Sequence, residues 1–497
     1  MLPVHVEGRR RQGGGRRQGP EGYGGRGQAR LPFQGTPGGH FRRHASGSGL
    51  EAGRAADRKA GSGRRFAKLG AKIYEGHARL NVFNAQVVVT SSAVSAENPE
   101  VLEAARLGIP VIRRAEMLAE LMRMKFSVAV AGAHGKTTVT SMIAVILAQA
   151  GLDPTAVIGG RLDVFGSSAR LGKGELMVVE ADESDRSFLH LLPTIAVVTN
   201  IDREHLDHYG DLEDIANAFT SFMNKVPFYG AVIACVDPPW QALFRSLQPR
   251  LHRRVVTYGI EPGADVTASS VKLSPAGADF EVEVKGKPLG PFSIRVPGRH
   301  NVQNALAAIA VGLELDLNAA QIREGFKQFR GADRRFQVKA SYDGITLVDD
   351  YGHHPSEIRA TLDAARLGKW KRIWVIFQPH RYTRTKFLMD DFASCFNGCD
   401  RVDVLDIYPA SEPPIPGITS QRLVERMGEL GFGRARYAPS EEAVMNEVLN
   451  QAQPGELIMT IGAGSITKMS ETLAEAMRKL GTPAKKKKDS SERPVSH

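Results

Sequence analysis

The stretch FSVAVAGAHGKTTVTSMIAVILAQAG, residues 126–151, combines a short apolar run, a turn with two glycines and a longer apolar segment. The first run has the length of a buried strand, and the segment after the turn carries apolar residues at helical spacing. These residues are Val139, Met142, Ile143, Ile146 and Leu147. Because that spacing gathers them on one side, the stretch predicts a strand, a loop and a helix whose apolar face packs on a sheet.

The turn between them, Gly132-Ala133-His134-Gly135-Lys136-Thr137-Thr138, has the composition of a phosphate-binding loop. Backbone N–H groups of such a turn, with the positive end of the following helix dipole, attract phosphate. In this pattern Lys136 would contact the β- and γ-phosphates, and the Thr137 hydroxyl would bind Mg²⁺. The spacing is G-x-x-G-K-T, shorter than the commoner form. A chance glycine turn is the alternative, but the flanking strand and helix favour an ATP site.

Acidic residues follow the next apolar run. LMVV leads directly into Glu180, with Asp182, Glu183 and Asp185 close behind. Mg²⁺ prefers carboxylate oxygen and keeps several waters, so one or two of these acids would suffice beside a triphosphate. The motif TNIDREHLDHYG then places His205 after another strand end. Alone, His205 would be a structural histidine, but near a phosphate loop it is a candidate metal ligand or proton acceptor.

Alternating short strands and helices extend to both sides of this unit and predict an α/β protein with parallel sheets. Toward the N-terminus lie AQVVVTSSA and NPEVLEAARLGIPVI; toward the C-terminus GITLVDD, RIWVIF, RVDVLDIY and ELIMTIGAG read as buried strands. A chain of 497 residues should form about three domains. We expect an N-terminal segment at 1–65, domains at 66–122, 123–330 and 331–480, and a basic, disordered tail at 481–497.

The two ends of the chain are strongly basic, whereas its body is not. The net charge is +11, but residues 1–65 hold 14 Lys/Arg against 4 Asp/Glu, and the tail from Lys485 is also basic. The body is therefore close to neutral and offers no basic face for specific nucleic-acid binding. No run of about 20 apolar residues predicts a membrane span, and no apolar stretch of a secretory signal follows the N-terminal arginines. We expect a cytoplasmic enzyme. Its oligomeric state does not follow from the sequence.

Seven segments together resemble one family, the Mur ligases of peptidoglycan precursors. In order, they are GAHGKTT, EADESDRSFLHL, TNIDREHLDHYG, PGRHNVQNALAA, GADRRFQ, LVDDYGHHPSEI and FQPHRYTRT. The resemblance covers about residues 66–480 and is most detailed to the member that adds L-alanine. It implies three domains: one that binds UDP, a central phosphate-loop ATPase, and a C-terminal Rossmann-like domain. It also implies that ATP, with Mg²⁺, phosphorylates the lactyl carboxylate of UDP-N-acetylmuramate, and that L-alanine attacks the acyl phosphate.

The resemblance assigns roles to particular positions. Lys136, Thr137 and Glu180 match phosphate and Mg²⁺ contacts, and His205 matches a histidine near a second metal. The nucleotide would be held by His300, Asn301 and Asn304. Arg335 and Asp350 match C-terminal residues that join the ATP site. Substrate-facing positions are His353, His354, His380, Arg381 and Arg384.

The chain departs from the family at its N-terminus. Family members open with a strand and a glycine-rich turn for the UDP diphosphate, whereas residues 1–65 contain 17 glycines and no legible strand. We interpret this segment as a shifted reading frame or a degenerate region that impairs UDP binding. Two other functions stay open. One is the related ligase that attaches a recycled peptide to UDP-N-acetylmuramate, and the other is an inactive ligase body with a nucleic-acid-binding arm.

Overall fold

The computed structural model describes residues 50–53, 67, 70–91, 94–162, 167–202 and 209–481. The chain forms two compact units, Met1–Met117 and Leu118–His497. Among the described residues, no helix has the length and apolar character that a membrane crossing needs.

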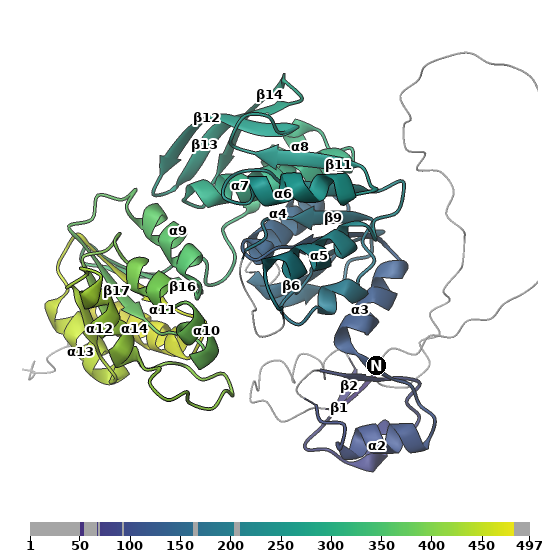
Figure 1. The fold of residues 1–497 in the computed structure, drawn as a ribbon, viewed down its shortest axis with the longest axis horizontal. Coiled ribbons are helices and arrows are strands. Elements are labelled where there is room, and N and C mark those ends of the chain that lie inside the picture. Colours follow the sequence, from purple (N-terminus) through teal and green to yellow (C-terminus); the bar gives the residue numbers. More distant parts are fainter. Residues whose placement is uncertain are drawn as a thin grey trace, which may run out of the picture. The chain divides into compact units, whose positions relative to one another are not determined.

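The first unit contains two small parallel sheets (Figure 1). In one, β1 (Leu50–Gly53) pairs with β2 (Ala71–Tyr74), and in the other, β3 (Val88–Thr90) pairs with β4 (Val111–Arg113). Among the described residues of this unit, the helical elements are η1 (Arg79–Val82) and α2 (Pro99–Arg106), and α3 (Arg114–Arg123) begins here and continues into the second unit. Strand β1 lies within the segment 1–65, most of which is outside the described residues.

The second unit begins with a ten-stranded sheet of order β14-β13-β12-β11-β10-β9-β5-β8-β6-β7. Its strands are β5 (Phe126–Ala131), β6 (Thr155–Leu162), β7 (Ser167–Arg170), β8 (Leu176–Glu180), β9 (Ile195–Val198), β10 (Ala231–Cys235), β11 (Val255–Gly259), β12 (Val266–Ser274), β13 (Gly277–Val284) and β14 (Lys287–Ile294). In this spatial order, the seven strands from β12 through to β6 are parallel to one another. The antiparallel strand β7 extends one edge, and the antiparallel strands β13 and β14 extend the other. The parallel arrangement confirms the predicted α/β fold.

Helices cover both faces of this sheet, as alternation along β5 requires. Val128 and Val130 pack into the core beneath α4, α7 and α8, whereas Ala129 and Ala131 pack into the core beneath α5 and α6. The helical elements of this region are α3 (Arg114–Arg123), α4 (Lys136–Gln149), α5 (Leu212–Met223), α6 (Gln241–Leu247), α7 (Arg299–Glu314), α8 (Ala319–Gln328), η3 (Ser187–His190) and η4 (Gln248–Arg250).

Helix α4 is more enclosed than its sequence pattern predicts. The five apolar residues expected on one face are all buried. Every residue from Thr138 to Leu147 is buried as well, because α7 and α8 pack alongside α4. The strand–loop–helix prediction is confirmed, and the helix lies inside the domain instead of on its surface.

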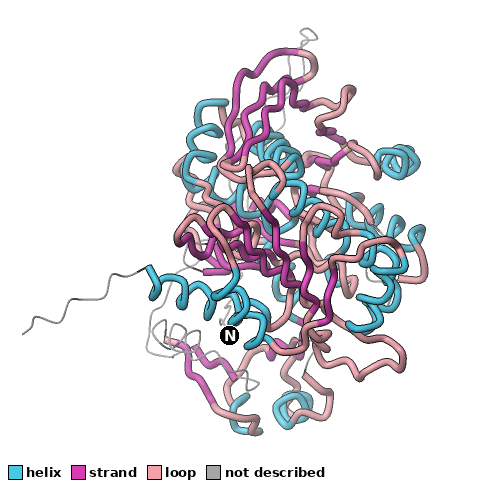
Figure 2. The backbone as a smooth tube through the Cα atoms, turned by 90° about the vertical axis from the view of Figure 1, so that its left-hand side faces the viewer, coloured by secondary structure: helices cyan, strands magenta, loops and turns pink. Residues whose placement is uncertain are grey.

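A six-stranded sheet of order β15-β16-β20-β17-β18-β19 follows. Figure 2 shows the strands of the chain in magenta and its helices in cyan. The strands of this sheet are β15 (Gln337–Tyr342), β16 (Ile345–Asp350), β17 (Arg372–Phe377), β18 (Arg401–Val404), β19 (Ala435–Tyr437) and β20 (Glu456–Ile461). Its helices are α9 (Pro355–Ala365), α10 (Tyr382–Phe387), α11 (Met389–Ser394), α12 (Ser420–Glu429), α13 (Glu441–Gln451) and α14 (Ile466–Gly481). The four predicted C-terminal strands are β16, β17, β18 and β20. All pair in parallel, so their carboxyl ends, and the loops that follow, share one edge of the sheet.

Candidate nucleotide and ligase site

The loop between β5 and α4 has a backbone that two glycines make possible. Gly132 and Gly135 have φ of 136° and 83°, and Gly135 is the N-cap of α4. A Cβ at Gly135 would lie 2.6 Å from Asn304 Oδ1, so a side chain there would collide with α7. The Asn200 side chain fixes the loop from the other side: its Oδ1 accepts from His134 N at 2.8 Å, and its Nδ2 donates to His134 O at 3.0 Å. The loop is therefore preformed.

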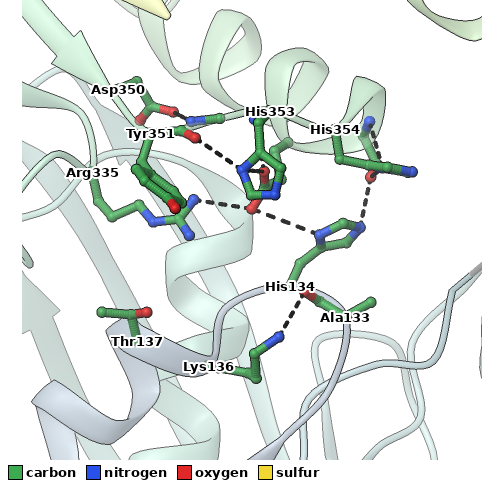
Figure 3. A network of polar contacts seen from close by, with 12 residues as sticks. Ala133, His134, Lys136, Thr137, Arg335, Asp350, Tyr351, His353 and His354 are labelled. Atoms are coloured by element: carbon green, nitrogen blue, oxygen red, sulfur yellow. Dashed lines mark hydrogen bonds and ion pairs between the residues drawn. The ribbon is translucent and has the colours of Figure 1, made fainter. Parts of the chain in front are cut away.

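Lys136, the first residue of α4, turns back across the loop. Its ammonium donates to the carbonyl oxygen of Gly132 at 2.7 Å. It also donates to the carbonyl oxygen of Ala133 at 3.3 Å (Figure 3). It also forms an ion pair with Glu183 Oε1 at 2.7 Å, whose side chain is 3% exposed. Glu183 belongs to the acidic motif, in which the resemblance assigned the magnesium role to Glu180; the sequence assigned no acid to Lys136, because this contact depends on how the chain turns after β8.

Thr137 and Glu180 meet beside two neighbouring strands: Glu180 ends β8, and Thr137 lies in the first turn of α4, after the loop that follows β5. Thr137 Oγ1 donates to Glu180 Oε1 at 3.1 Å, and Gly159 N donates to Glu180 Oε2 at 2.7 Å. A hydroxyl and a carboxylate side by side are the oxygen donors that Mg²⁺ requires. Asp182 instead closes a local turn by accepting from Ser184 N at 3.0 Å. His205 lies outside the described residues, and its role stays a prediction.

The N-terminus of α7 brings the predicted nucleotide residues to the loop. Asn304 Nδ2 donates to Asn301 Oδ1 at 3.1 Å, and Asn301 Nδ2 donates to Pro297 O at 2.7 Å. Burial, with the positive charge of Arg335, lowers the pKa of His300 to about 4, so its imidazole is neutral at pH 7. Thr138 is buried in the first turn of α4. A cavity of about 150 Å³ lies here; its lining includes Gly135, Thr138, Trp240, Tyr258, Gln303 and Arg335.

Arg335 and Asp350 come from the C-terminal sheet region. Arg335 Nη1 donates to Glu357 Oε1 at 3.0 Å. Although burial disfavours its charge, Glu357 and Asp350 hold the pKa of Arg335 above its usual value. Asp350 accepts backbone hydrogen bonds from Phe336 at 2.7 Å and Gly352 at 2.8 Å, while burial raises its pKa. Asp350 therefore braces the segment that presents Arg335.

A serine that the sequence reasoning missed links the phosphate loop to α9. Ser356 Oγ lies 2.7 Å from His134 Nε2 and 2.6 Å from His354 Nδ1 (Figure 3). The two imidazole centroids are 5.0 Å apart, and Asp202 Oδ2 is 3.3 Å from His134 Nε2. Both Ser356 and Glu357 stand in the quoted motif LVDDYGHHPSEI. No spacing in the sequence singles out these two residues, because the side chains that they contact are brought near them only by folding.

The other predicted substrate residues gather at the ends of β16 and β17. The rings of His353 and His380 are 5.9 Å apart, and Arg384 Nη1 lies 3.1 Å from His380 Nδ1. Burial, with His353 and Arg384 nearby, lowers the pKa of His380 to about 3. Arg381 has a φ of 72°, and its backbone N donates to Tyr408 O at 2.8 Å. His354 is the exception, because it joins the Ser356 link instead.

Comparisons with known proteins agree with this geometry. Three family descriptions match: "Mur ligase family, catalytic domain" over residues 53–126, "Mur ligase middle domain" over 130–312, and "Mur ligase, glutamate ligase domain" over 334–464. The chain is 54% identical over 415 residues to the UDP-N-acetylmuramate–L-alanine ligase of Acidobacterium capsulatum, covering 83% of this chain and 89% of that relative.

Solved structures share the fold. The UDP-N-acetylmuramate-alanine ligase of Thermotoga maritima matches with a TM-score of 0.71 and 27% identity, covering 86% of this chain and 93% of that one. A murein peptide ligase of Psychrobacter arcticus matches with a TM-score of 0.59 and 23% identity, covering 83% and 90%; at that identity the likeness concerns the fold alone. On the strength of the three matched domains and the high identity to curated relatives, this chain belongs to the Mur ligase family.

Proposed function

We propose that the chain is an ATP-dependent ligase that joins L-alanine to the lactyl carboxylate of UDP-N-acetylmuramate, a step of peptidoglycan precursor synthesis. The identity of 54% to a relative with that name supports the choice of substrates. The observation that carries the chemistry is the preformed loop with Thr137 beside Glu180. The use of ATP also leads us to infer a cytoplasmic enzyme.

The reaction needs activation of an unreactive group. A free carboxylate resists attack by an amine, because its oxygen is a poor leaving group. Transfer of the ATP γ-phosphoryl group to that oxygen makes an acyl phosphate, and the L-alanine amine can then displace inorganic phosphate as the amide bond forms. Such transfer depends on positioning and on positive groups that stabilise phosphate charge. The N-terminus of α4 and Lys136 offer both at the loop.

Oxygen donors in the loop suit a magnesium ion. Thr137 and Glu180 would hold it, and His205 would lie near a second ion. Bound Mg²⁺ would neutralise phosphate charge. The chain's own part is to orient these ligands: Glu180 is anchored by Gly159 N, and Thr137 is fixed in the first turn of α4.

The C-terminal residues would handle the substrates. Arg335, paired with Glu357, brings a fixed positive charge to the cavity lining. His353, Arg381 and Arg384 would bind the anionic groups of UDP-N-acetylmuramate and the alanine carboxylate. His380 would serve as a neutral hydrogen-bonding group, because a pKa of about 3 makes it too weak a base to remove a proton from an ammonium group.

The recycling ligase is the alternative within the family, and a substrate test separates the two. The purified chain, given UDP-N-acetylmuramate at concentrations high enough to offset the weak binding expected from residues 1–65, should release ADP and phosphate only when L-alanine is also present. The tripeptide L-Ala-γ-D-Glu-meso-diaminopimelate should not replace L-alanine. Equal or faster turnover with the tripeptide would reverse the assignment.

The variant Lys136→Ala tests the role of the phosphate loop in turnover. Removal of the ammonium group should reduce turnover by about two orders of magnitude or more, while a melting curve shows that the fold persists. Because the change removes a positive charge beside the buried Glu183 carboxylate, the double variant Lys136→Ala/Glu183→Gln should recover stability but not activity. Near-normal phosphate release by folded Lys136→Ala would contradict the ATP site.

A further inference from the structure

Two histidines and an aspartate from distant parts of the chain converge beside the phosphate loop. His134 lies within the loop, Asp202 follows β9, and His354 is the N-cap of α9. Each of these side chains offers one ring nitrogen or carboxylate oxygen, and the three atoms lie within 4.8 Å of one another. Imidazole nitrogen and carboxylate oxygen are ligands that zinc takes in proteins, often three of them with water in a fourth position. The cluster therefore has the composition of a zinc site.

The hydroxyl of Ser356 marks the point on which the two imidazoles converge (Figure 3). Zinc bonds to nitrogen and oxygen of about 2.0–2.2 Å place neighbouring ligands of a tetrahedron about 3.3–3.4 Å apart. Asp202 Oδ2 already lies 3.3 Å from His134 Nε2. The two imidazoles, at most 4.8 Å apart at their ligand atoms, exceed that spacing by no more than about 1.5 Å. Rotation of the side chains, with displacement of the hydroxyl, can close this difference.

The surroundings of the cluster suit zinc better than magnesium. Mg²⁺ prefers oxygen ligands, whereas two of the three groups here are imidazoles, which suit zinc. On the other side of the His134 ring, Glu357 Oε1 lies 3.8 Å from Nδ1. A metal-bound imidazole commonly gives the hydrogen of its second nitrogen to such a carboxylate, which fixes the orientation of the ring. The cluster thus has an outer partner as well as three inner ligands.

We propose that His134, Asp202 and His354 bind a zinc ion at a position separate from the magnesium position at Thr137 and Glu180. The ion ties the phosphate loop to the segment after β9 and to the start of α9. Because α9 belongs to the C-terminal sheet region, bound zinc acts as a clamp between that region and the loop. The clamp uses nitrogen ligands that Mg²⁺ does not favour, so excess Mg²⁺ does not displace the zinc.

Calorimetric titration of the full chain with Zn²⁺ tests the site, with Mg²⁺ in excess to occupy the oxygen ligands. His354→Gln and Asp202→Asn each remove one ligand. Each should weaken zinc binding at least about tenfold, because the loss of even an outer partner costs that much. Ser356→Ala is the matched control: it removes the hydroxyl between the histidines but keeps all three ligands, and it should retain the parent affinity. His252→Gln, which changes an exposed histidine elsewhere, should also bind as the parent does.

Two further measurements connect binding to the clamp. Co²⁺ takes the same ligands as zinc and absorbs visible light strongly when its coordination is tetrahedral. This absorption should appear in the wild type and in Ser356→Ala, and it should be lost in Asp202→Asn. Zinc should also raise the melting temperature of the wild type, because it binds the folded state, and should raise that of Asp202→Asn much less.

The outcomes do not depend on the proposed function, because no nucleotide or substrate is present. Absence of zinc binding by the wild type would overturn the inference. So would parent affinity in both His354→Gln and Asp202→Asn, since their melting curves show whether these variants are folded. Loss of binding in Ser356→Ala as complete as in the ligand variants would show that the hydrogen-bonded link, and not a set of metal ligands, is what the cluster provides.

Discussion

Glu180 and Asp182 are two residues apart and hold different partners. Glu180 connects Thr137 of the loop with Gly159 N, whereas Asp182 accepts from the backbone of Ser184 within its own turn. Acidic residues in one short motif can therefore differ in function, since one faces the phosphate loop and the other stabilises the backbone that follows β8.

A pair of amide substitutions tests this division. Glu180→Gln should cut turnover by about two orders of magnitude or more, with only partial rescue by added Mg²⁺, because the neutral amide is a poor ligand for that ion. Asp182→Asn should retain most activity, because asparagine can still accept from Ser184 N. Turnover across a Mg²⁺ titration measures both. Greater damage from Asp182→Asn would show that the metal ligand is misassigned.

The stability of the folded protein at acidic pH should show that His300 is neutral in the folded state. Its pKa is about 4 in the folded protein, below the usual value of about 6.5, so the unfolded chain binds the proton more readily. Stability is therefore present at pH 7 and is lost as the pH falls from about 6.5 toward 4. Between pH 7 and 5 the wild type should lose up to about 2 kcal/mol more than His300→Gln. Denaturant unfolding at both values measures this, and parallel losses would contradict the burial of a neutral imidazole.

At the scale of elements, α4 is bounded by two glycines with similar backbones and different surroundings. Gly135 begins the helix with a φ of 83°, and Gly151 follows its end with a φ of 80°. A Cβ at Gly135 would meet Asn304, whereas one at Gly151 would meet nothing within 4 Å. The two positions therefore separate backbone strain from a collision at the nucleotide site.

Alanine at each position should give different results. Gly151→Ala should cost about 1–2 kcal/mol of stability from the left-handed backbone alone and leave nucleotide affinity unchanged. Gly135→Ala carries a similar backbone strain and should also weaken ATP binding at least about tenfold, because the added methyl group displaces the Asn304 side chain at the nucleotide site. Melting curves and ATP titrations distinguish the two, and equal ATP affinity in both variants would show that the loop tolerates the extra atom.

Elements with a contiguous pattern were predictable. The loop at 132–138, the strand and helix that flank it, and the four parallel C-terminal strands follow from apolar periodicity. The meeting of Thr137 with Glu180 is of the same kind, because Glu180 ends β8 and Thr137 lies in the first turn of the helix that follows the neighbouring strand β5. The hydrogen bond between Ser356 and His134 joins residues 222 positions apart. The hydrogen bond that Gln303 Nε2 donates to Asp237 Oδ2 joins residues 66 positions apart. Such contacts depend on how separate loops pack, and no local spacing encodes them.

At the scale of the whole molecule, the two substrates depend on different parts of the chain. The residues proposed for ATP, including Lys136, Glu180, Asn301 and Arg335, lie in the second unit. The family's UDP-diphosphate turn should fall within residues 1–65, where the described part is β1. The matched family domain begins at residue 53.

We therefore expect the chain to bind ATP normally and UDP-N-acetylmuramate poorly. Loss of two charge-assisted hydrogen bonds to the diphosphate, each worth about 1.5–3 kcal/mol, would weaken binding by about two to four powers of ten. Calorimetry would compare this chain with a version whose first 65 residues restore an apolar strand and a glycine-rich turn. Equal micromolar affinity of both for UDP-N-acetylmuramate would show that the unusual segment is a working form of the site.

The hydroxyl of Ser356 has only one proton to share between two imidazoles. His354 Nδ1 accepts from the backbone N of Ser356 at 3.4 Å as the N-cap of α9, so this nitrogen is unprotonated and the hydroxyl must donate to it. Ser356 Oγ can then only accept from His134, whose Nε2 must carry a hydrogen. The start of a helix more than 200 residues away therefore requires the same tautomer of this phosphate-loop histidine as the Asp202 carboxylate, which lies 3.3 Å from the same nitrogen. A proton added to His354 Nδ1 would undo the helix cap and remove the acceptor of the Ser356 hydroxyl, while Asp202 would keep the hydrogen on His134 Nε2.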